Sequence, residues 1–574
     1  MSMRDLLTKL STVSRRRAPF VALLLVASLQ SVAFAERRER RIEGWRPVHY
    51  EVRLAFDAGL SEVKRAETEI TVLILRDGVG VVDLDFGEMP LDGVSVGGRP
   101  ARYERPPGRL NVSLPRAARR GERFAVTVSY HGRPKDGLIL TKDKDGNPSA
   151  TGDNWPDRVH HWIPSLDHPS AKASVTFMIT TPGDMVAVAN GRLVGTGSGT
   201  RDSEWLYVEP HAIPPYCMIV AVARDEVIES RAPASRRIAP LLYYVAPSER
   251  AFAEKGFAAA PPSLELFSRL VAPYPYEKLA HIVGATRFGG MENSGAIVYA
   301  STLFDARPNE PLSARFGIRR GLVEVVAHET AHQWFGDSVS PATWADLWLS
   351  EGFATYFAGL LVERYEGAAA FRDYMSRAAN AYLLYEKTRR APIHDRETED
   401  LNKLLNANNY QKGAWVLHTL RARLGDPAFF RGIRLYYNAH KDGNATTEDL
   451  RAALERASGR NLREFFARWI YASGHPVYQA SWKWRGGAGR GGGGVATLTL
   501  AQAQEGEPFL TAVPVEIVAE GGVLRRLLVR PTGRETSVIV PLARRPVEVR
   551  VDPGATILKE VLSAPVRKAV AASR

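Results

Sequence analysis

Apolar and polar residues alternate along much of residues 36–230, with the period of two that is typical of strands exposed on one face. The segments 50–54 and 124–128 show this alternation, and turns separate them from similar runs. Between residues 231 and 474 the apolar positions recur with helical spacing instead, as in 461–470. We therefore expect an all-β domain at residues 36–230, followed by a mainly helical domain at residues 231–474.

A third pattern begins after residue 474. Residues 486–494 are nearly all glycine and are flanked by β-type runs such as 495–500. This predicts a hairpin loop within a small carboxy-terminal β-sandwich at residues 475–565, followed by a flexible tail at 566–574. No Lys-Ser or Lys-Thr pair follows the glycines, so a phosphate-binding loop is not expected. The predicted fold class is multidomain α+β.

Within the helical region, residues 323–335 combine an apolar frame with two histidines. His328 and His332 are four positions apart, so on a helix they lie on one face about 6 Å from each other. Gly336 stands where such a helix would end. Because two imidazoles at this spacing can bind one tetrahedral ion, the pattern predicts a zinc site.

Two glutamates supply the remaining groups of a hydrolytic zinc site. Glu329 lies one step round the helix from the first histidine, where it can hold a metal-bound water without being a ligand. Glu351 lies in a second apolar run, 347–357, where a carboxylate needs a cation to compensate its charge. Ser350 or Asp346 is a candidate cap of that second helix. Two histidines and Glu351 leave the fourth metal position open for water and substrate.

The alternative for the two histidines is structural. A motif of this form occurs by chance in roughly one or two of every hundred chains of this length. Both imidazoles can be satisfied core residues without a metal. The helical apolar frame and the placement of Glu351 favour zinc.

Four motifs make this chain similar to the aminopeptidase N family of zinc exopeptidases, which also includes leukotriene hydrolase. They lie at residues 289–293, 328–337, 344–354 and 410–414. The resemblance covers most of the chain and implies a thermolysin-like fold for the domain at residues 231–474. It also implies one zinc ion per chain, bound by His328, His332 and Glu351.

The first motif consists of Gly289, Gly290, Met291, Glu292 and Asn293, and the resemblance implies that it binds substrate. Two glycines let an extended backbone lie close to a peptide, and Glu292 can offer negative charge to a free α-ammonium. Such an anchor restricts cleavage to the amino-terminal residue, because binding energy is available only to chains whose amino terminus reaches it. Taken alone, the glycine pair is also consistent with a turn.

Tyr410 receives a role only from the resemblance, since its spacing does not distinguish it from the other tyrosines. In the family the matching tyrosine donates a hydrogen bond to the oxyanion of the tetrahedral intermediate. The resemblance likewise implies that Glu329 is the general base, taking a proton from water and passing it to the leaving amine. Asp346 and Glu324 are both candidates to orient the histidine ligands, and the sequence does not choose between them.

One segment departs from the family pattern. Residues 160–169 resemble the family's Arg-Arg-x-Phe-Pro-x-x-Asp-Glu-Pro with histidines replacing the arginines, and no zinc site is predicted there. Aligned on this segment, Trp155 falls where the family commonly supplies a second Glu or Gln to the substrate amine. Asp153, Asn154 and Asp157 are the candidates to replace that contact.

Residues 1–35 have the pattern of a signal peptide. Three arginines at 15–17 precede an apolar run at 18–29, and residues 33–35 have the small-x-small form of a signal-peptidase site. We expect cleavage before Glu36 and export to the periplasm or the extracellular space. The apolar run is shorter than the roughly 20 residues of a membrane-spanning helix, so no stable span is expected after cleavage. A retained amino-terminal anchor is the alternative.

Composition is consistent with a large exported enzyme. The chain has 574 residues, 45% of them hydrophobic, which is enough to bury several cores. Its net charge is +13, but the basic clusters are not interleaved with aromatic residues, so no nucleic-acid partner is expected. The single cysteine, Cys217, excludes an intramolecular disulfide and has the surroundings of a small buried residue.

The sequence thus predicts a zinc-dependent aminopeptidase that hydrolyses peptides with a free amino terminus. A zinc endopeptidase is one alternative, and it would also cleave peptides with a blocked amino terminus. A non-catalytic peptide-binding protein on the same fold is the other. Side-chain preference, the biological peptide and the oligomeric state depend on loops and surfaces that one sequence does not define.

Overall fold

The computed structural model describes residues 36–199, 201–232, 238–305, 307–486, 493–522 and 524–562. The predicted signal peptide and the predicted tail at 566–574 lie outside the described residues. The described chain forms two compact units, a small one of residues 36–38 with 396–399 and a large one with all the others. In the small unit, the Arg37 backbone N–H donates to the carbonyl of Arg396 at 2.7 Å.

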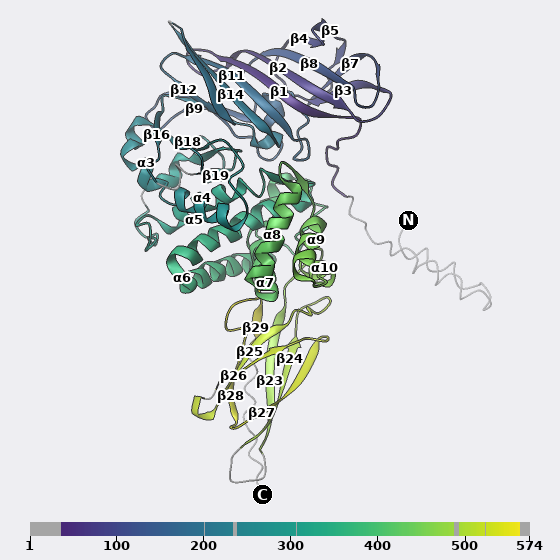
Figure 1. The fold of residues 1–574 in the computed structure, drawn as a ribbon, viewed down its shortest axis with the longest axis vertical. Coiled ribbons are helices and arrows are strands. Elements are labelled where there is room, and N and C mark those ends of the chain that lie inside the picture. Colours follow the sequence, from purple (N-terminus) through teal and green to yellow (C-terminus); the bar gives the residue numbers. More distant parts are fainter. Residues whose placement is uncertain are drawn as a thin grey trace, which may run out of the picture. The chain divides into compact units, whose positions relative to one another are not determined.

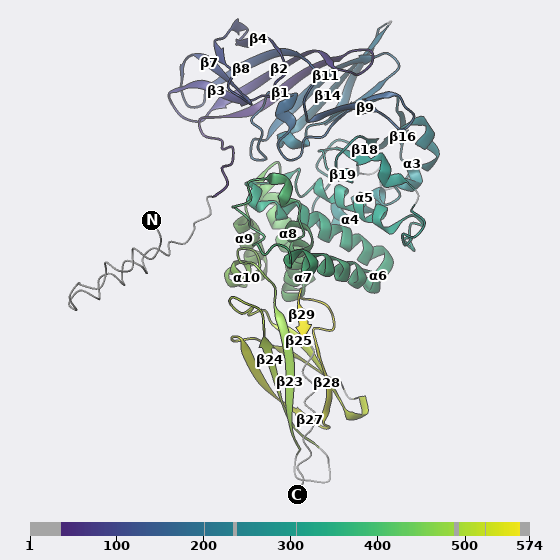
Figure 2. The same cartoon turned by 180° about the vertical axis from the view of Figure 1, so that it is seen from behind.

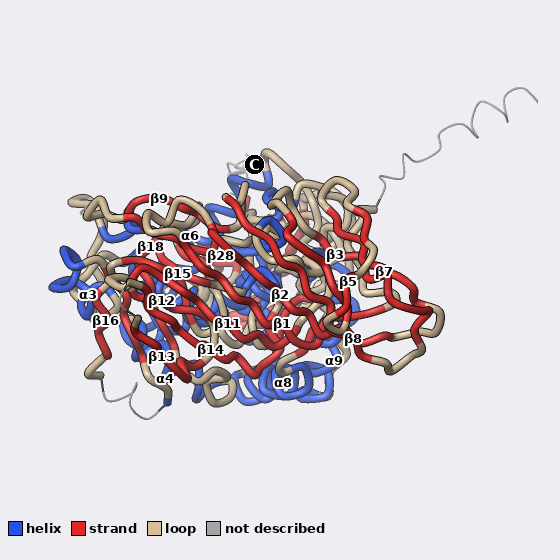
Figure 3. The backbone as a smooth tube through the Cα atoms, turned by 90° about the horizontal axis from the view of Figure 1, so that it is seen from above, coloured by secondary structure: helices blue, strands red, loops and turns tan. Residues whose placement is uncertain are grey.

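Strands dominate the amino-terminal region, as the two-residue alternation predicts, and the longest of them run side by side in one eight-stranded sheet (Figures 1 and 3). β1 pairs antiparallel with β2 and parallel with β11, so the sheet is mixed. In spatial order its strands are β13 (Arg192–Ser198), β14 (Asp202–Ile213), β11 (Ala173–Pro182), β1 (Trp45–Phe56), β2 (Val63–Ile74), β8 (Arg123–Gly132), β4 (Leu91–Val96) and β5 (Arg99–Pro100).

The alternation in β1 explains why this segment is a strand. Tyr50, Val52 and Leu54 are buried, whereas Glu51 and Arg53 lie on the opposite, more exposed face. Successive side chains of a strand point to opposite faces, so one face of β1 packs on the core while the other carries charge. The strand predicted at residues 50–54 is confirmed.

Three smaller sheets complete the strands that precede the main helices. The first is β12 (Val186–Ala189), β15 (Val220–Ala223), β10 (Pro148–Gly152) and β9 (Leu138–Lys142), and the second is β3 (Val79–Asp85), β7 (Arg109–Ala118) and β6 (Tyr103–Glu104). The third is β16 (Glu226–Glu229), β17 (Leu241–Val245), β18 (Leu279–Gly284), β20 (Ala296–Ala300) and β19 (Gly290–Met291). In this five-stranded sheet β19 is an edge strand, which leaves one side of its backbone available for pairing.

Helices dominate residues 250–469, as predicted (Figure 1). They are α3 (Arg250–Gly256), α4 (Ala260–Leu270), α5 (Arg320–His332), α6 (Trp348–Glu386), α7 (Gly413–Leu424), α8 (Asp426–His440), α9 (Thr447–Ser458) and α10 (Arg463–Trp469). Strands β18, β19 and β20 lie between α4 and α5, and two further short strands, β21 (Val339–Pro341) and β22 (Gly443–Ala445), pair in parallel. Neither the long helix α6 nor any other described helix has the apolar stretch needed to cross a membrane.

Helix α5 contains the two histidines singled out in the sequence. It ends at His332, and the chain then turns through Gly336, whose φ of 126° is a conformation that favours glycine. A Cβ at Gly336 would lie 2.5 Å from Ser350 Oγ and 3.0 Å from His332 Nδ1. The predicted helix and its stop signal are confirmed, with the last helical residue four positions before the glycine.

Helix α6 begins at Trp348 and has no side-chain cap. The predicted caps are therefore wrong. Ser350 lies inside the helix, and Asp346 belongs to a preceding 3₁₀ turn, η5 (Trp344–Asp346). The Asp346 carboxylate instead accepts hydrogen bonds from the backbone and hydroxyl of Thr447, at 2.9 and 2.8 Å, and so ties this turn to the start of α9.

The carboxy-terminal part is again made of strands (Figure 2). One sheet contains β27 (Glu535–Leu542), β24 (Gly494–Gln502), β23 (Val477–Gly486) and β29 (Glu560–Leu562), and another contains β26 (Leu524–Val529), β25 (Val513–Ala519) and β28 (Pro546–Val551). Gly486 pairs with Gly494 across an antiparallel hairpin, as the glycine run predicts, although loop residues 487–492 lie outside the described ones. The predicted fold class of β-rich, helical and β-sandwich-like parts is confirmed, and its exact boundaries remain predictions.

A buried lysine joins the amino-terminal sheet region to the end of the histidine helix. Lys172 is 6% exposed, and its ammonium donates to the carbonyls of Asp337 and Ser338 at 2.8 Å each and of Gly443 at 3.1 Å. A buried ammonium requires such partners, because desolvation of an unpaired charge is costly. Two of these bonds hold the turn that follows α5, and the third holds the start of β22.

Candidate active site

The candidate site lies in a cleft of about 630 Å³. Its walls come from α5, from α6, from strand β19 and from the turn around Tyr410. Nine of the ten residues predicted from the sequence to form the site line this cleft: Gly289, Gly290, Met291, Glu292, His328, Glu329, His332, Glu351 and Tyr410. Asn293 is the exception, since it is fully buried and its amide donates to the Met291 carbonyl at 3.4 Å.

Three potential metal ligands converge in the cleft. The Nε2 atoms of His328 and His332 are 3.0 Å apart, and Glu351 Oε2 lies 3.3 Å from the first and 3.4 Å from the second. Ligand atoms about 2.0–2.1 Å from a tetrahedral zinc ion lie roughly 3.3–3.4 Å from one another. The spacing of these three atoms therefore fits zinc.

The charges in the cleft also favour a cation. Burial lowers the pKa of His332, but the carboxylates of Glu351 and Glu292 outweigh burial and raise it to about 10. Burial raises the pKa of Glu351, but the two histidines outweigh burial and lower it to about 2. A field that favours positive charge on an imidazole equally favours a metal ion between the same groups.

The orientation of His332 is set by groups that the sequence did not indicate. Its Nδ1 lies 3.0 Å from the Phe335 carbonyl and 3.0 Å from Ser350 Oγ. A carbonyl only accepts, so Nδ1 carries the proton and Nε2 is left to bind a metal. The prediction that Asp346 or Glu324 orients His328 or His332 is wrong, because Asp346 bonds to the start of α9 and Glu324 pairs with Arg377.

Glu329 is a buried carboxylate held against strand β19. It is 6% exposed, and a Cβ built on Gly290 would lie 2.4 Å from its Oε1. Glycine at position 290 is therefore required for this carboxylate to occupy its place. Burial, followed by the neighbouring carboxylates of Glu292 and Glu351, raises the pKa of Glu329 well above its usual value.

Strand β19 presents backbone and charge to the cleft. Gly290 and Met291 pair with β20 on one side only. Gln333, just after α5, holds this segment by donating to the Glu292 carbonyl at 3.2 Å and accepting from the Gly295 N–H at 2.8 Å. Burial, with the Glu351 carboxylate, raises the pKa of Glu292 to about 7. An edge strand can pair with the backbone of an extended peptide, and a buried carboxylate beside it can bind a positive group at the end of that peptide.

Tyr410 reaches the cleft through a turn of π-helix, η7 (Asn408–Lys412), that precedes α7. Its ring stacks on the His328 ring, with centroids 5.8 Å apart and planes 1° from parallel. Burial and the Glu351 carboxylate raise the pKa of the Tyr410 hydroxyl well above its usual value, so this group stays protonated and can donate. Isolated π turns of this kind are frequent at functional sites.

A close approach of two backbones brings Glu351 and Tyr410 together. A Cβ at Gly352 would lie 3.0 Å from Gly413 Cα and 3.1 Å from the Asn409 carbonyl. We expect Gly352→Ala to destabilise the protein by about 1–2 kcal/mol, since added bulk in a packed interior costs up to about 3 kcal/mol and alanine regains roughly 1 kcal/mol in a helix. Thermal unfolding measures this change.

The matched control is Gly533→Ala, where an added Cβ meets no atom within 4 Å. We expect this variant to unfold within about 0.5 kcal/mol of the wild type, as surface substitutions usually do. Equal stability of the two variants would contradict the close contact between α6 and η7.

Trp155 lines the cleft and presents an aromatic ring where the family commonly has a Glu or Gln. Its ring packs edge to face on Phe288 and Trp344, with centroids 6.0 and 5.8 Å apart. Asp153 bonds to Arg158 at 2.9 Å, and the Asn154 amide donates to the Met218 carbonyl at 2.6 Å. Neither of these two side chains, nor Asp157, lines the cleft. Glu292 is therefore the carboxylate of this wall that can contact a substrate amine.

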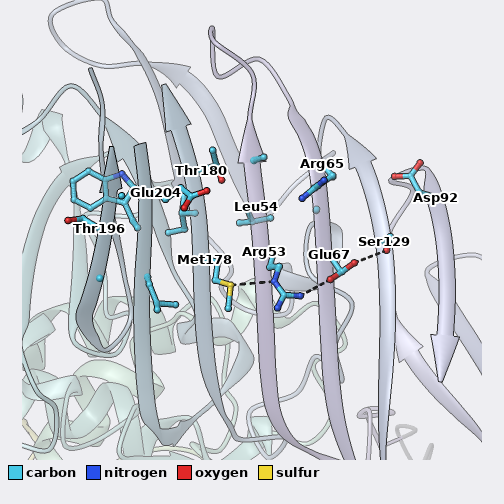
Figure 4. Close-up of a pocket in the computed structure, with 17 residues that line it drawn as sticks. Arg53, Leu54, Arg65, Glu67, Asp92, Ser129, Met178, Thr180, Thr196 and Glu204 are labelled. Atoms are coloured by element: carbon cyan, nitrogen blue, oxygen red, sulfur yellow. Dashed lines mark hydrogen bonds and ion pairs between the residues drawn. The ribbon is translucent and has the colours of Figure 1, made fainter. Parts of the chain in front are cut away.

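A second hollow, of about 780 Å³, lies on the exposed face of the eight-stranded sheet (Figure 4). Arg53 projects there from β1, with Met178 on one side and Glu67, 2.7 Å away, on the other. None of the three groups of potential metal ligands found among the described residues lies in this hollow. The chemistry predicted from the sequence is thus assembled in the smaller cleft.

Comparison with family models gives a match over the part of the chain that contains most of the cleft residues. The model of the "Peptidase family M1 domain" matches residues 259–469, which include His328 and His332, the four glutamates that line the cleft, and Tyr410.

Several curated proteins are similar over a longer stretch. Aminopeptidase M1 of Arabidopsis thaliana is 28% identical over 428 residues, which cover 73% of this chain and 44% of that protein. Probable aminopeptidase 2 of Sulfurisphaera tokodaii is 27% identical over 333 residues, covering 57% of this chain and 42% of the other. The chain thus spans less than half the length of these two relatives.

A solved structure is similar in fold. The M1 zinc metallopeptidase from Deinococcus radiodurans superposes with a TM-score of 0.63 at 23% identity, covering 75% of this chain and 94% of that one.

Proposed function

We propose that this chain is a zinc-dependent aminopeptidase that removes the amino-terminal residue from peptides, because residues 259–469 match the peptidase family M1 domain. The observation that carries the proposal is the convergence of His328, His332 and Glu351 within 3.0–3.4 Å of one another, beside the buried Glu329. The aminopeptidase names of the similar proteins give independent support.

His328, His332 and Glu351 would hold one zinc ion in the cleft. When bound there, zinc polarises the scissile carbonyl and lowers the pKa of water. Glu329 accepts a proton from the attacking water and later delivers it to the leaving amine. The Tyr410 hydroxyl donates a hydrogen bond to the oxygen on which negative charge develops.

Glu292 makes the proposed reaction specific for the amino terminus. The substrate lies along the free side of β19, and its α-ammonium pairs with the Glu292 carboxylate. A peptide with an acetylated amino terminus loses this ion pair and would bury the carboxylate without a partner. Peptides with a free amino terminus are therefore the proposed substrates.

Hydrolysis of aminoacyl p-nitroanilides, each free or acetylated, tests the proposal. We expect release from the free substrates alone, loss of activity with a chelator, and recovery with added zinc. Cleavage of acetylated substrates would instead indicate the endopeptidase. Absence of any cleavage by zinc-loaded protein would favour the peptide-binding alternative.

Glu292→Gln should weaken this recognition. We expect kcat/KM for free substrates to fall between about tenfold and about a hundredfold, because a hydrogen bond to a charged group is worth about 1.5–3 kcal/mol. The same panel measures the change, and Glu265→Gln, on the exposed face of α4, is the control. Unchanged kcat/KM in Glu292→Gln would rule out the amine contact.

We further propose that the chain is exported. The support is the signal-peptide pattern of residues 1–35. Sequencing the amino terminus of the protein from the producing cells tests this proposal. A mature chain that starts at Glu36 agrees with cleavage, and an intact Met1 in a membrane fraction indicates the anchor.

A further inference from the structure

A second group of potential metal ligands lies outside the catalytic cleft. Glu209 and His211 are two positions apart on β14, in the stretch where its register against β11 shifts, and their side chains converge. Glu277 precedes β18 and approaches the imidazole, with its Oε1 3.5 Å from His211 Nε2. One ligand atom from each of the three residues lies within 4.8 Å of the other two. None of the three lines the catalytic cleft.

Two carboxylate oxygens in this group have no protein partner. Glu209 is 0% exposed, and its Oε1 accepts the His211 backbone N–H at 2.9 Å. Among the described residues, the buried Oε2 atoms of Glu209 and Glu277 have no hydrogen-bond donor. Burial, followed by repulsion from Glu277, raises the pKa of Glu209 to about 7. Buried carboxylate oxygens without a donor are costly, and a cation would satisfy both.

Asp442 orients the imidazole for metal binding. Its Oδ2 lies 3.2 Å from His211 Nδ1, and its other oxygen accepts from Ser338 Oγ at 3.4 Å. If Nδ1 donates to Asp442, the Nε2 lone pair faces Glu277. A carboxylate behind a ligating histidine is the usual way in which proteins fix the tautomer of a metal ligand.

The neighbouring lysines are engaged elsewhere. The Lys278 ammonium donates to the carbonyls of Ala189 and Gly295, at 2.8 and 3.2 Å, and Lys172 donates to the three carbonyls described above. Neither donates to Glu209 or Glu277 among the hydrogen bonds of the described residues. The competing explanation is a protonated His211, whose pKa is raised to about 10 by its bonds to Asp442 and Glu277. An imidazolium, however, leaves both Oε2 atoms without a donor.

The geometry points to a second metal site, in which Glu209, His211 and Glu277 bind a divalent transition-metal ion and Asp442 orients the imidazole. One imidazole nitrogen and two carboxylate oxygens suit zinc and similar ions. The side chains of His211, Glu277 and Asp442 are 24%, 29% and 31% exposed, so an ion can enter from solvent. The ion would connect strand β14, the segment before β18 and the turn between α8 and β22.

Zinc content of the full chain after equilibration with zinc and gel filtration tests the site. We expect two ions in the wild type, one in Glu277→Gln, one in Glu351→Gln, and none in the double variant. The control Glu265→Gln should keep two. The proposal would be overturned if the wild type bound one zinc ion and Glu277→Gln also bound one. That result would favour a protonated His211.

Thermal unfolding supplies a second readout that does not depend on peptidase activity. In the Glu351→Gln background, we expect zinc to raise the midpoint temperature, since a ligand that binds only the folded state stabilises it. Addition of either Glu277→Gln or His211→Gln should abolish this rise, and a rise that survives both would contradict the site. Glu277→Gln alone should retain peptidase activity, so failure of this site and failure of the proposed function are distinguishable.

Discussion

Replacement of Glu329 with glutamine is expected to lower kcat about a thousandfold while zinc remains bound. Glutamine has the shape of glutamate and keeps the contact with the Gly290 backbone, where only 2.4 Å separate a built Cβ from Oε1. It cannot accept a proton, and a positioned general base contributes about a hundredfold to ten-thousandfold to a rate. The measurement pairs kcat on a free aminoacyl p-nitroanilide with the zinc content of the same sample.

Glu265→Gln is the matched control for this substitution. It removes the same charge from an exposed position on α4, and kcat should stay within about twofold of the wild type. If Glu329→Gln held zinc and kept more than a tenth of the wild-type kcat, Glu329 would not be the base. If it lost zinc, the carboxylate would instead be needed for the metal site.

Replacement of Tyr410 with phenylalanine is expected to lower kcat between about a hundredfold and about a thousandfold, with a much smaller change in KM. The phenylalanine ring can keep the stacking on His328 at 5.8 Å, so only the hydroxyl is lost. A single donor to the developing oxyanion is worth this factor, because the charge it meets exists in the transition state and not in the substrate. Steady-state kinetics on one free substrate separate kcat from KM.

Tyr356→Phe is the control for the loss of a hydroxyl. Tyr356 lies on α6, and its hydroxyl contacts His418 and Arg421 at 3.3 and 3.4 Å, away from the cleft. This variant should change kcat less than about threefold, although it can lower stability. Comparable losses of kcat in both variants would show that the effect of Tyr410→Phe is structural.

The elements that carry the metal ligands were predictable, because they obey local periodicity. Four-residue spacing on a helix places His328 beside His332, and a carboxylate in an otherwise apolar run distinguishes Glu351. The motifs that contain these residues indicated a similarity to the aminopeptidase N family, and the model of the peptidase family M1 domain matches residues 259–469, where these motifs lie. The fold class followed from the change between two-residue and helical periodicity.

The groups that orient and place the site residues were not predictable, because they depend on turns and on backbone atoms. His332 is oriented by the Phe335 carbonyl and by Ser350, and no side-chain pattern marks a carbonyl. Tyr410 enters the cleft from a π-helical turn, whose extra residue shifts every following side chain around the axis. Asn293 was grouped with its neighbours by motif, yet it faces the interior.

The ligands of the proposed second metal site could not be predicted from the sequence, for a different reason. Glu209 and His211 share one strand, but Glu277 and Asp442 come from segments far along the chain. Only the fold brings these groups together. Glutamates and histidines at such separations have no spacing that distinguishes them from solvated surface residues.

The hydrogen bonds of Lys172 to three carbonyls limit where this chain can be divided without loss of contacts. Residues 259–469 are the stretch that the family model matches, but the ammonium that holds the turn after α5 comes from residue 172. β17, at Leu241–Val245, likewise pairs with β18 from outside that stretch. Excised alone, the matched stretch would lose the Lys172 donor and the strand that neighbours β18. The smallest part of this chain that keeps both contacts is therefore larger than the stretch that the family model matches.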